Sequence, residues 1–227
     1  MITVGSCKTR AGFTIAELLV VFWVLLILAA IIIPAPGHPD RRWARIVHCM
    51  SNLKQVSDGL QSWSDAHERH FPFELSVSNG GSQELITKAA AAAQFQPLTN
   101  YLTNLAQVLI CPAETKRRVA STNQTLSDSN ISYFINIDAS PTTQMHAANL
   151  ILAGDRHLTA GTRPVAPGMF VLSTKTPLGW TTELHGSLKK PSGIFLFLDG
   201  HVEEVRADRL TNTVQNQPLA INRLLIP

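Results

Sequence analysis

The sequence lacks the local patterns of common catalytic and nucleotide-binding sites. It has no G-x-S-x-G elbow, no P-loop, no G-x-G-x-x-G segment and no H-E-x-x-H pair. Esterases, nucleotide-binding proteins and zinc proteases depend on these patterns, because each places a nucleophile, a phosphate cradle or metal ligands at a fixed spacing. The eight histidines are scattered. We therefore expect a protein that is not an enzyme.

Long blocks of one charge are also missing. The formal net charge is only +3, and no lysine and arginine block is interleaved with aromatic residues, so the composition indicates no nucleic-acid partner. Two basic residues, Lys8 and Arg10, lie in the first twelve residues, which contain no acid. Under the positive-inside rule, this asymmetry predicts a cytoplasmic N-terminus.

Cysteine is rare, with Cys7, Cys49 and Cys111 as the three examples. No CxxC pair and no Cys/His spacing indicates a zinc site. In an oxidising compartment, Cys49 and Cys111 are candidates for a disulfide. Two buried free thiols are the alternative, and the sequence leaves both open.

Charge disappears after Glu17, and the next sixteen residues, up to Ile33, are uncharged. A helix from Phe13 to Ile33 has 21 residues, which at about 1.5 Å each spans the roughly 30 Å core of a bilayer. We predict a transmembrane helix over residues 13–33. An ionisable group in such a segment is a functional candidate, so Glu17 is the leading functional residue.

These features together resemble the start of prepilins, the precursors of type IV pilins and type II secretion pseudopilins. Prepilin leaders are cut after a glycine, which leaves an N-methylated phenylalanine, with glutamate at the fifth mature position. Gly12, Phe13 and Glu17 match that order, and Pro34 falls at mature position twenty-two. The resemblance implies cleavage between Gly12 and Phe13, methylation of Phe13, and pairing of Glu17 with the N-terminal ammonium of a neighbouring subunit.

The resemblance also implies partners and a location. The partners are a prepilin peptidase, other pilin-like subunits, an inner-membrane assembly platform and the lipid bilayer. The location is the inner (cytoplasmic) membrane, crossed once, with a periplasmic or extracytoplasmic C-terminal domain. One alternative is a plain single-pass anchor that tethers a binding module and does not assemble. Another is a conventional secretory signal, which would place its apolar run before the cleavage site.

The remaining chain is long enough for one domain. A proline-rich break over residues 34–39 separates the apolar helix from residues 40–227. Asp40 is a candidate N-cap for an amphipathic helix, because apolar residues recur every three or four positions from Trp43 to Trp63. We expect this helix to end near His67.

Further helices are expected over residues 82–93, which are rich in alanine, and 97–109. Short strands are expected over residues 131–137, 149–153, 169–172, 194–198 and 201–205. Asp199-Gly200 lies between the last two strands and predicts a type I′ hairpin. Helices first and antiparallel strands later predict an α+β fold, which is also that of a pilin-like head.

A second resemblance covers this domain. The sequence C-x-x-N-L-K-Q from Cys49 to Gln55, the F-P pair at 71–72 and the terminal Asp199-Gly200 are similar to a pilin-like family with a prepilin-type processing-associated H-X9-DG motif. His185 is the matching histidine, although 13 residues separate it from Asp199 where the motif has nine. The prolines at 34–39 also depart from the continuous first helix of that family.

Two roles are open for Asp199 and Gly200. The pair supplies the backbone conformation of a tight turn without any ligand. Alternatively, Asp199 binds a cation such as calcium together with His185 or His201. Calcium prefers six to eight oxygen ligands, and the sequence offers no D-x-D-x-D loop. It offers only scattered carboxylates: Asp155, Glu183, Asp199 and Glu203.

Overall fold

The computed structural model describes residues 12–32, 41–88, 90–120, 126–142, 148–182, 185–187 and 190–227. Contacts divide the chain into two compact units, Met1–Pro39 and Asp40–Pro227. The division falls at the end of the proline-rich segment. Residues 1–11, with Cys7, Lys8 and Arg10, and residues 33–40 lie outside the described part, so the predictions of a leader and of a proline break stay predictions.

The described part of the first unit contains one helix, α1 (Ile15–Ile32, 18 residues). At about 1.5 Å per residue its length is about 27 Å, short of the roughly 30 Å hydrocarbon core, and Glu17 lies in its first turn. In the described part of the chain, no helix has the combined length and apolar character that crossing a membrane requires. The predicted transmembrane helix over 13–33, and with it the single-pass inner-membrane location, is therefore wrong.

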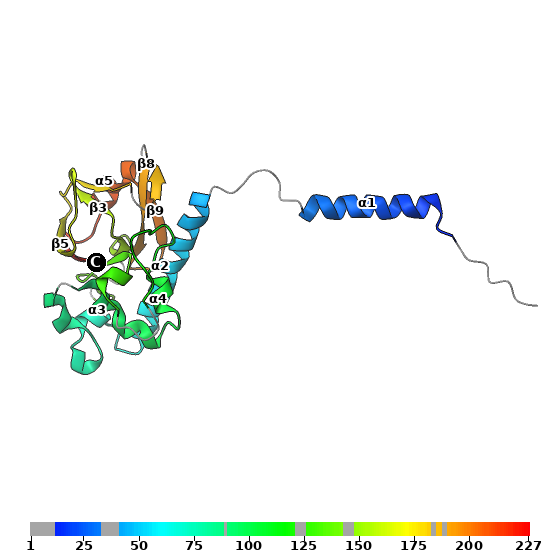
Figure 1. Cartoon of the computed structure of the whole chain (residues 1–227). Coiled ribbons are helices and arrows are strands. Elements are labelled where there is room, and N and C mark those ends of the chain that lie inside the picture. The colour runs from blue at the N-terminus through cyan, green and yellow to red at the C-terminus, as the bar shows by residue number, and fades with distance from the viewer. Residues whose placement is uncertain are drawn as a thin grey trace, which may run out of the picture. The chain divides into compact units, whose positions relative to one another are not determined.

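The second unit begins with α2 (Arg41–Asp65), which confirms the predicted amphipathic helix. Its apolar stripe is buried at Ile46, Leu53, Val56, Leu60 and Trp63. In Figure 1, α2 runs beside β8 and β9, and contacts join it to both strands. From Ile46 to Trp63 the stripe therefore covers the sheet, as its periodicity predicts, whereas two predicted members, Trp43 and Val47, are exposed.

The next helical region is more broken than predicted. Ala90, before α3, provides no side-chain cap, and Pro97 interrupts the following turn because it lacks an N–H donor. Two long helices over 82–93 and 97–109 are therefore replaced by short pieces. These are η3 (Gln83–Lys88), α3 (Ala91–Phe95), η4 (Gln96–Asn100) and α4 (Leu105–Val108). Three further short turns of helix lie outside these ranges: η1 (Pro72–Glu74), η2 (Val77–Asn79) and η5 (Asp128–Asn130).

An antiparallel seven-stranded sheet forms the centre of this unit. Its order is β5-β10-β1-β2-β8-β7, and β9 also pairs with β8. The strands are β1 (Tyr133–Asn136), β2 (Ile151–Asp155), β5 (Gly168–Ser173), β7 (His185–Ser187), β8 (Lys190–Phe197), β9 (Val202–Arg206) and β10 (Ile221–Ile226). The five predicted strands are present as β1, β2, β5, β8 and β9. The antiparallel sheet with helices is thus the part of the predicted fold class that stands.

A smaller antiparallel sheet has the order β4-β3-β6. Its strands are β3 (Leu158–Ala160), β4 (Arg163–Pro164) and β6 (Leu178–Trp180). Helix α5 (Ala207–Gln215) follows β9 and buries Leu210 and Val214, one helical turn apart. Trp180 packs against Phe195 of the large sheet, with ring centroids 5.0 Å apart, so the two sheets share a core.

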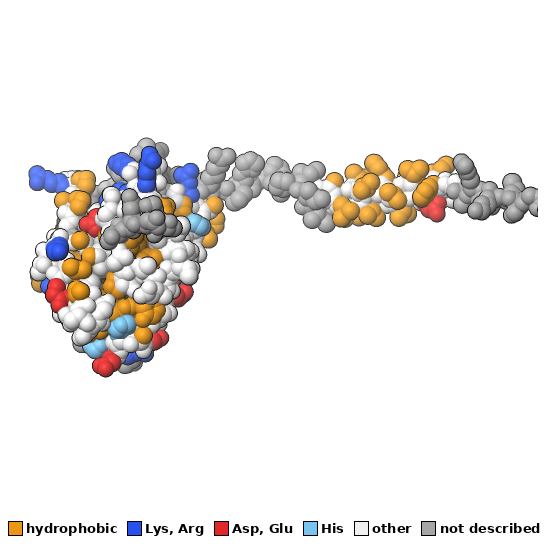
Figure 2. Space-filling view, turned by 60° about the horizontal axis from the view of Figure 1, so that its bottom comes forward, with side chains coloured by type: hydrophobic (Ala, Val, Ile, Leu, Met, Phe, Trp, Pro, Cys, Tyr) orange, Lys and Arg blue, Asp and Glu red, His pale blue; other side chains and the backbone are white. Residues whose placement is uncertain are grey.

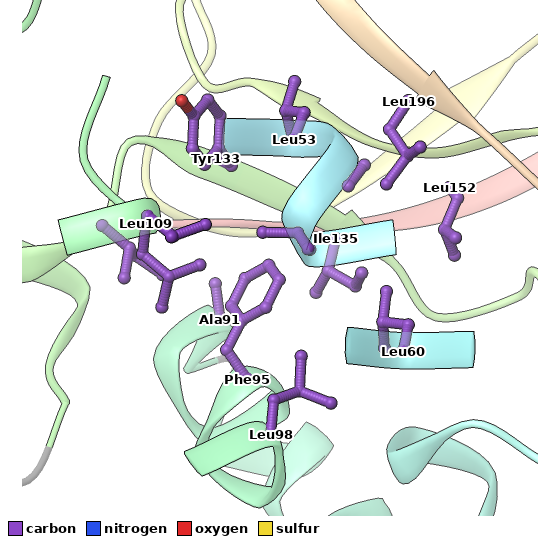
Figure 3. Close-up of a cluster of buried hydrophobic side chains, with 14 of the residues drawn as sticks. Leu53, Leu60, Ala91, Phe95, Leu98, Leu109, Tyr133, Ile135, Leu152 and Leu196 are labelled. Carbon is purple, nitrogen blue, oxygen red and sulfur yellow. The ribbon is translucent and has the colours of Figure 1, made fainter. Parts of the chain in front are cut away.

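That core lies on both faces of the large sheet. On one face, Leu53 and Leu60 of α2 lie near Ile135, Leu152 and Leu196 of the strands (Figure 3). Phe95 and Leu98 close the same cluster from the short helices. The other face packs against the small sheet and α5 through residues that include Phe134, Phe195, Trp180 and Leu210.

Candidate functional site

Glu17 belongs to a reciprocal cap at the start of α1. Its Oε2 accepts hydrogen bonds from the backbone N–H of Thr14 at 2.7 Å and from the Thr14 hydroxyl at 2.8 Å. The backbone N–H of Glu17 donates back to Thr14 Oγ1 at 3.3 Å. Threonine followed three residues later by glutamate is a capping box, so Glu17 has a local structural role in addition to any role in assembly.

The surroundings of Gly12 and Phe13 are open. A Cβ atom built on Gly12 meets no atom within 4 Å, and its φ is not in the left-handed region. Phe13 is 84% exposed. Nothing in the described fold therefore requires glycine at position 12 or an aromatic residue at position 13.

Apolar side chains surround α1 on all sides. Eleven consecutive residues, from Leu18 to Leu28, are large, apolar and exposed, and hydrophobic side chains cover the visible face of the helix in Figure 2. A helix that is apolar around its whole circumference is typical of a buried environment. The first unit offers no such environment in its described part, so α1 is suited to a partner outside its own unit.

Asp199 and Gly200 form the connection between β8 and β9. Gly200 has φ +86° and donates its N–H to the Phe197 carbonyl at 2.9 Å. Asp199 stays at negative φ, so the predicted type I′ turn is wrong, since that turn needs positive φ at both central residues. The predicted hairpin itself is confirmed, because β8 and β9 pair in antiparallel register.

The Asp199 carboxylate is used inside this turn. Its Oδ1 accepts the backbone N–H of His201 at 3.0 Å and contacts the ring Nδ1 of the same histidine at 2.5 Å. Lys54 of α2 donates to the Gly200 carbonyl at 3.1 Å. The lysine of the C-x-x-N-L-K-Q segment therefore connects the amphipathic helix to the Asp-Gly turn, which the sequence alone did not indicate.

His185 does not join Asp199. It lies on β7 opposite Ser192 of β8, and Asp199 follows the far end of β8. Ser192 and Phe197 are five residues apart, which is about 17 Å along a strand. A site shared by His185 and Asp199 is therefore excluded, whereas the alternative pairing of Asp199 with His201 is present.

His185 instead belongs to a buried group that we call the His185 cluster: Cys49, Cys111, Asp155 and His185. Cys49 and Cys111 are joined by a disulfide with a Cα–Cα distance of 5.2 Å. His185 Nε2 lies 3.3 Å from Cys111 Sγ and 3.5 Å from Asp155 Oδ2. All four residues are at most 1% exposed.

These four side chains come from four different parts of the fold. Cys49 comes from α2, Cys111 follows α4, Asp155 ends β2 and His185 begins β7. Asp155 Oδ2 also accepts the backbone N–H of Ile194 at 2.8 Å. Among the described residues, Asp155 Oδ1 and His185 Nδ1 have no hydrogen-bond partner. Unpaired buried polar atoms are costly, and here they belong to a carboxylate and an imidazole that lie beside a disulfide, so this cluster is a candidate site.

Burial shifts both ionisable groups of the cluster toward neutrality. Burial raises the pKa of Asp155 to about 7, with a further increase from nearby Glu114, while the Ile194 N–H and Arg156 act in the opposite direction. Burial also lowers the pKa of His185 to about 4, assisted by His157. His185 is thus a neutral imidazole at pH 7, the form that binds metals.

A second group, the Glu114 cluster, lies beside the first and comprises Glu114, Arg117, Arg156 and His157. Glu114 Oε2 lies 3.0 Å from Arg156 Nη2 and 3.4 Å from His157 Nε2. Burial alone would raise the pKa of Glu114, but hydrogen bonds from His157, the Lys116 N–H and Arg156 lower it far below its usual range. Glu114 is paired by several cationic partners, which indicates a structural role, although the buried Nη1 of Arg117 has no hydrogen-bond partner among the described residues.

The predicted calcium ligands are dispersed. Asp155 is in the His185 cluster, Asp199 is in its turn, and Glu203 pairs with Arg209 at 3.3 Å on the surface. Glu183 lies outside the described residues. The structure brings no two of the three described carboxylates together, so the calcium hypothesis gains no support.

Sequence reasoning offered Cys49 and Cys111 as a disulfide pair, and the structure contains that disulfide, but it did not join them to Asp155 and His185. Asp155 and Cys111 are 44 positions apart in the chain, and only the pairing of β1 with β2 and of β2 with β8 brings them near His185. One signal was present in the sequence. Asp155 is the last residue of an otherwise uncharged strand, and all five residues of that strand are buried.

The chain was compared with family models, with curated proteins and with solved structures, and none of the three comparisons finds a match.

Proposed function

We propose that this protein is a non-enzymatic structural subunit of a pilin-like assembly, of the type II secretion pseudopilin or type IV pilus kind. One observation carries the proposal: α1 exposes large apolar side chains along its length and has a single acid, Glu17, at its start. Helices from neighbouring copies would cover that apolar surface. Assembly through α1 would thus bury the apolar area that a lone chain leaves in water.

Cleavage between Gly12 and Phe13 by a prepilin peptidase is the first step of the proposal. The open surroundings of Gly12 support it, because the described fold gives no steric reason for a glycine there. Recognition by the peptidase is a reason independent of folding. Cleavage would create a positive ammonium at Phe13, one residue before the Thr14 amide that Glu17 already binds.

Glu17 would then have two roles. Its Oε2 caps the first turn through Thr14, while an ionised carboxylate retains further lone pairs for the Phe13 ammonium of another subunit. Between packed apolar helices, a lone charge would be costly, whereas a pair is tolerated only in one axial position. The charge would therefore set the register of subunits, and the apolar surface would supply the affinity.

Mass spectrometry of the N-terminus tests the first step. Full-length protein produced with a prepilin peptidase should begin at N-methyl-Phe13, and protein produced without the peptidase should keep Met1. Gly12→Ala should keep Met1 in both cases. An intact Met1 in the wild-type chain with an active peptidase present would refute processing.

Cross-linking of the processed protein tests the role of Glu17, and two substitutions separate its functions. Glu17→Gln keeps a side chain that can complete the capping box but removes the charge, whereas Glu17→Ala removes both. We expect both variants to lose ordered multimers. Normal multimers from Glu17→Gln, with loss only in Glu17→Ala, would show that the cap and not the charge matters.

A further inference from the structure

We infer that the His185 cluster is a metal site when its disulfide is reduced, and that it then binds one zinc-like divalent ion. Cys49 Sγ, Cys111 Sγ and His185 Nε2 are the three ligands already grouped, and Asp155 Oδ2, beside His185 Nε2, is the fourth. The inference does not depend on the proposed assembly. It rests on the position of the four side chains.

The spacing of the ligand atoms carries the argument. The two sulfurs and a ring nitrogen of His185 all lie within 4.8 Å of one another. In a tetrahedral site with zinc–ligand bonds of 2.0 to 2.3 Å, neighbouring N, O and S atoms are about 3.3 to 3.6 Å apart. His185 Nε2 lies 3.3 Å from Cys111 Sγ and 3.5 Å from Asp155 Oδ2. Two edges of the tetrahedron are therefore already formed.

Two movements complete the site: the two sulfurs separate, to about 3.8 Å in such a tetrahedron, and the Asp155 carboxylate moves toward them, since the group of atoms within 4.8 Å of one another comprises Cys49, Cys111 and His185. Reduction by a dithiol achieves the first: two electrons and two protons pass to the Cys49–Cys111 bond, giving two thiols, and the dithiol becomes a cyclic disulfide. Each thiol then releases one proton to solvent as its sulfur binds the metal. The disulfide and the metal site are thus alternative states of the same two cysteines.

The remaining ligands are positioned by the fold. The Ile194 N–H donates to Asp155 Oδ2 at 2.8 Å, and a carboxylate oxygen has a second lone pair for a metal. The strand pairing of His185 with Ser192 fixes the backbone of the histidine. Two thiolates, one imidazole and one carboxylate form a donor set that favours zinc over calcium or magnesium.

Refolding tests the inference, because the site is fully buried and a metal enters most readily while the chain folds. The probe is Zn²⁺ itself, added at one equivalent to full-length Cys7→Ser protein, in which only Cys49 and Cys111 remain. Protein refolded with a dithiol should retain one zinc per chain after gel filtration, and the same protein refolded oxidised should retain none. Equal zinc content in the two redox states, or none in either, would overturn the inference.

Cobalt substitution and matched variants identify the ligands. Reduced protein with Co²⁺ should show a thiolate-to-cobalt charge-transfer band and the intense visible bands of a tetrahedral site. His185→Gln should abolish stoichiometric binding, and Asp155→Asn should weaken it about 10- to 100-fold. His201→Gln, at an exposed histidine outside the cluster, should change nothing. Circular dichroism of each variant establishes that it has folded, and unchanged binding in folded His185→Gln would overturn the assignment.

Discussion

Trp23 and Trp63, one in each unit, differ in how much of the side chain is exposed to solvent. Trp23 of α1 is 63% exposed, whereas Trp63 of α2 is 2% exposed and belongs to the main core. Both residues lie in helices rich in apolar residues. The periodicity differs: α2 alternates apolar and polar faces, while α1 is apolar on every face. A helix with one apolar face can bury that face against its own domain, whereas a helix that is apolar on every face is left with apolar side chains in solvent.

The largest effect that distinguishes the units is expected from tryptophan truncation. Trp63→Ala should lower the free energy of unfolding of residues 40–227 by about 3 to 5 kcal/mol, because it empties a filled core position. Trp23→Ala should leave that free energy unchanged, within about 0.5 kcal/mol. Urea unfolding of the full chain, followed by circular dichroism, measures both. Similar losses of unfolding free energy in the two variants would contradict this difference between the units.

The free energy of unfolding should depend on pH through the two buried ionisable groups of the His185 cluster, Asp155 and His185. For Asp155, the folded pKa of about 7 lies above the unfolded 3.8, so its contribution to stability falls as pH rises from 4 to 7. For His185, the folded pKa of about 4 lies below 6.5, so its contribution rises between pH 4 and 6.5. The two slopes oppose each other in the wild type.

Single substitutions should reveal how each group alone changes the free energy of unfolding with pH. Asp155→Asn leaves His185, so stability should increase with pH between 4 and 6.5, whereas His185→Gln leaves Asp155, so stability should decrease. Each slope is at most about 1.4 kcal/mol per pH unit. Urea unfolding of the oxidised full chain at pH 4.5, 5.5 and 6.5 measures them. The same direction of change in both variants would contradict the assignment.

A smaller effect separates two glycines, one in each unit. Gly200→Ala should destabilise by about 1 to 2 kcal/mol, since a side chain in the left-handed region is strained and its Cβ would lie 3.0 Å from Ser57 Oγ. Gly12→Ala should leave the unfolding free energy unchanged, because no atom lies within 4 Å. Thermal unfolding of the two variants gives the comparison, and a destabilised Gly12→Ala would show that glycine 12 serves the fold.

The sequence was most informative where a pattern was both periodic and local. The stripe from Trp43 to Trp63 predicted α2 and most of its buried face, although Trp43 and Val47 are exposed. Asp199-Gly200 predicted the hairpin. Helix length was harder to predict. α1 has 18 residues where 21 were predicted, and α3 and α4 are short helices whose starts have no side-chain cap. Apolar composition alone does not reveal where a helix begins or ends.

The His185 cluster could not be predicted for a different reason. Its members are separated by up to 136 positions, from Cys49 to His185, and the sheet order brings them together. The H-X9-DG resemblance connected His185 with Asp199, but the eight residues of β8 hold them apart. The strands β3, β4, β6, β7 and β10 and helix α5 were also unforeseen, because they are short or begin in polar segments.

The position of β10 has a consequence for the order in which this domain folds. β10 (Ile221–Ile226) lies between β5 and β1 and pairs with both. β1 and β5 precede it by roughly 50 to 90 residues, and they are joined to each other only through it. During synthesis, β5 therefore has no strand partner in this sheet until β10 has left the ribosome. Closure over so long a loop is slow, and an uncharged strand such as β5 is exposed to wrong pairing during that interval.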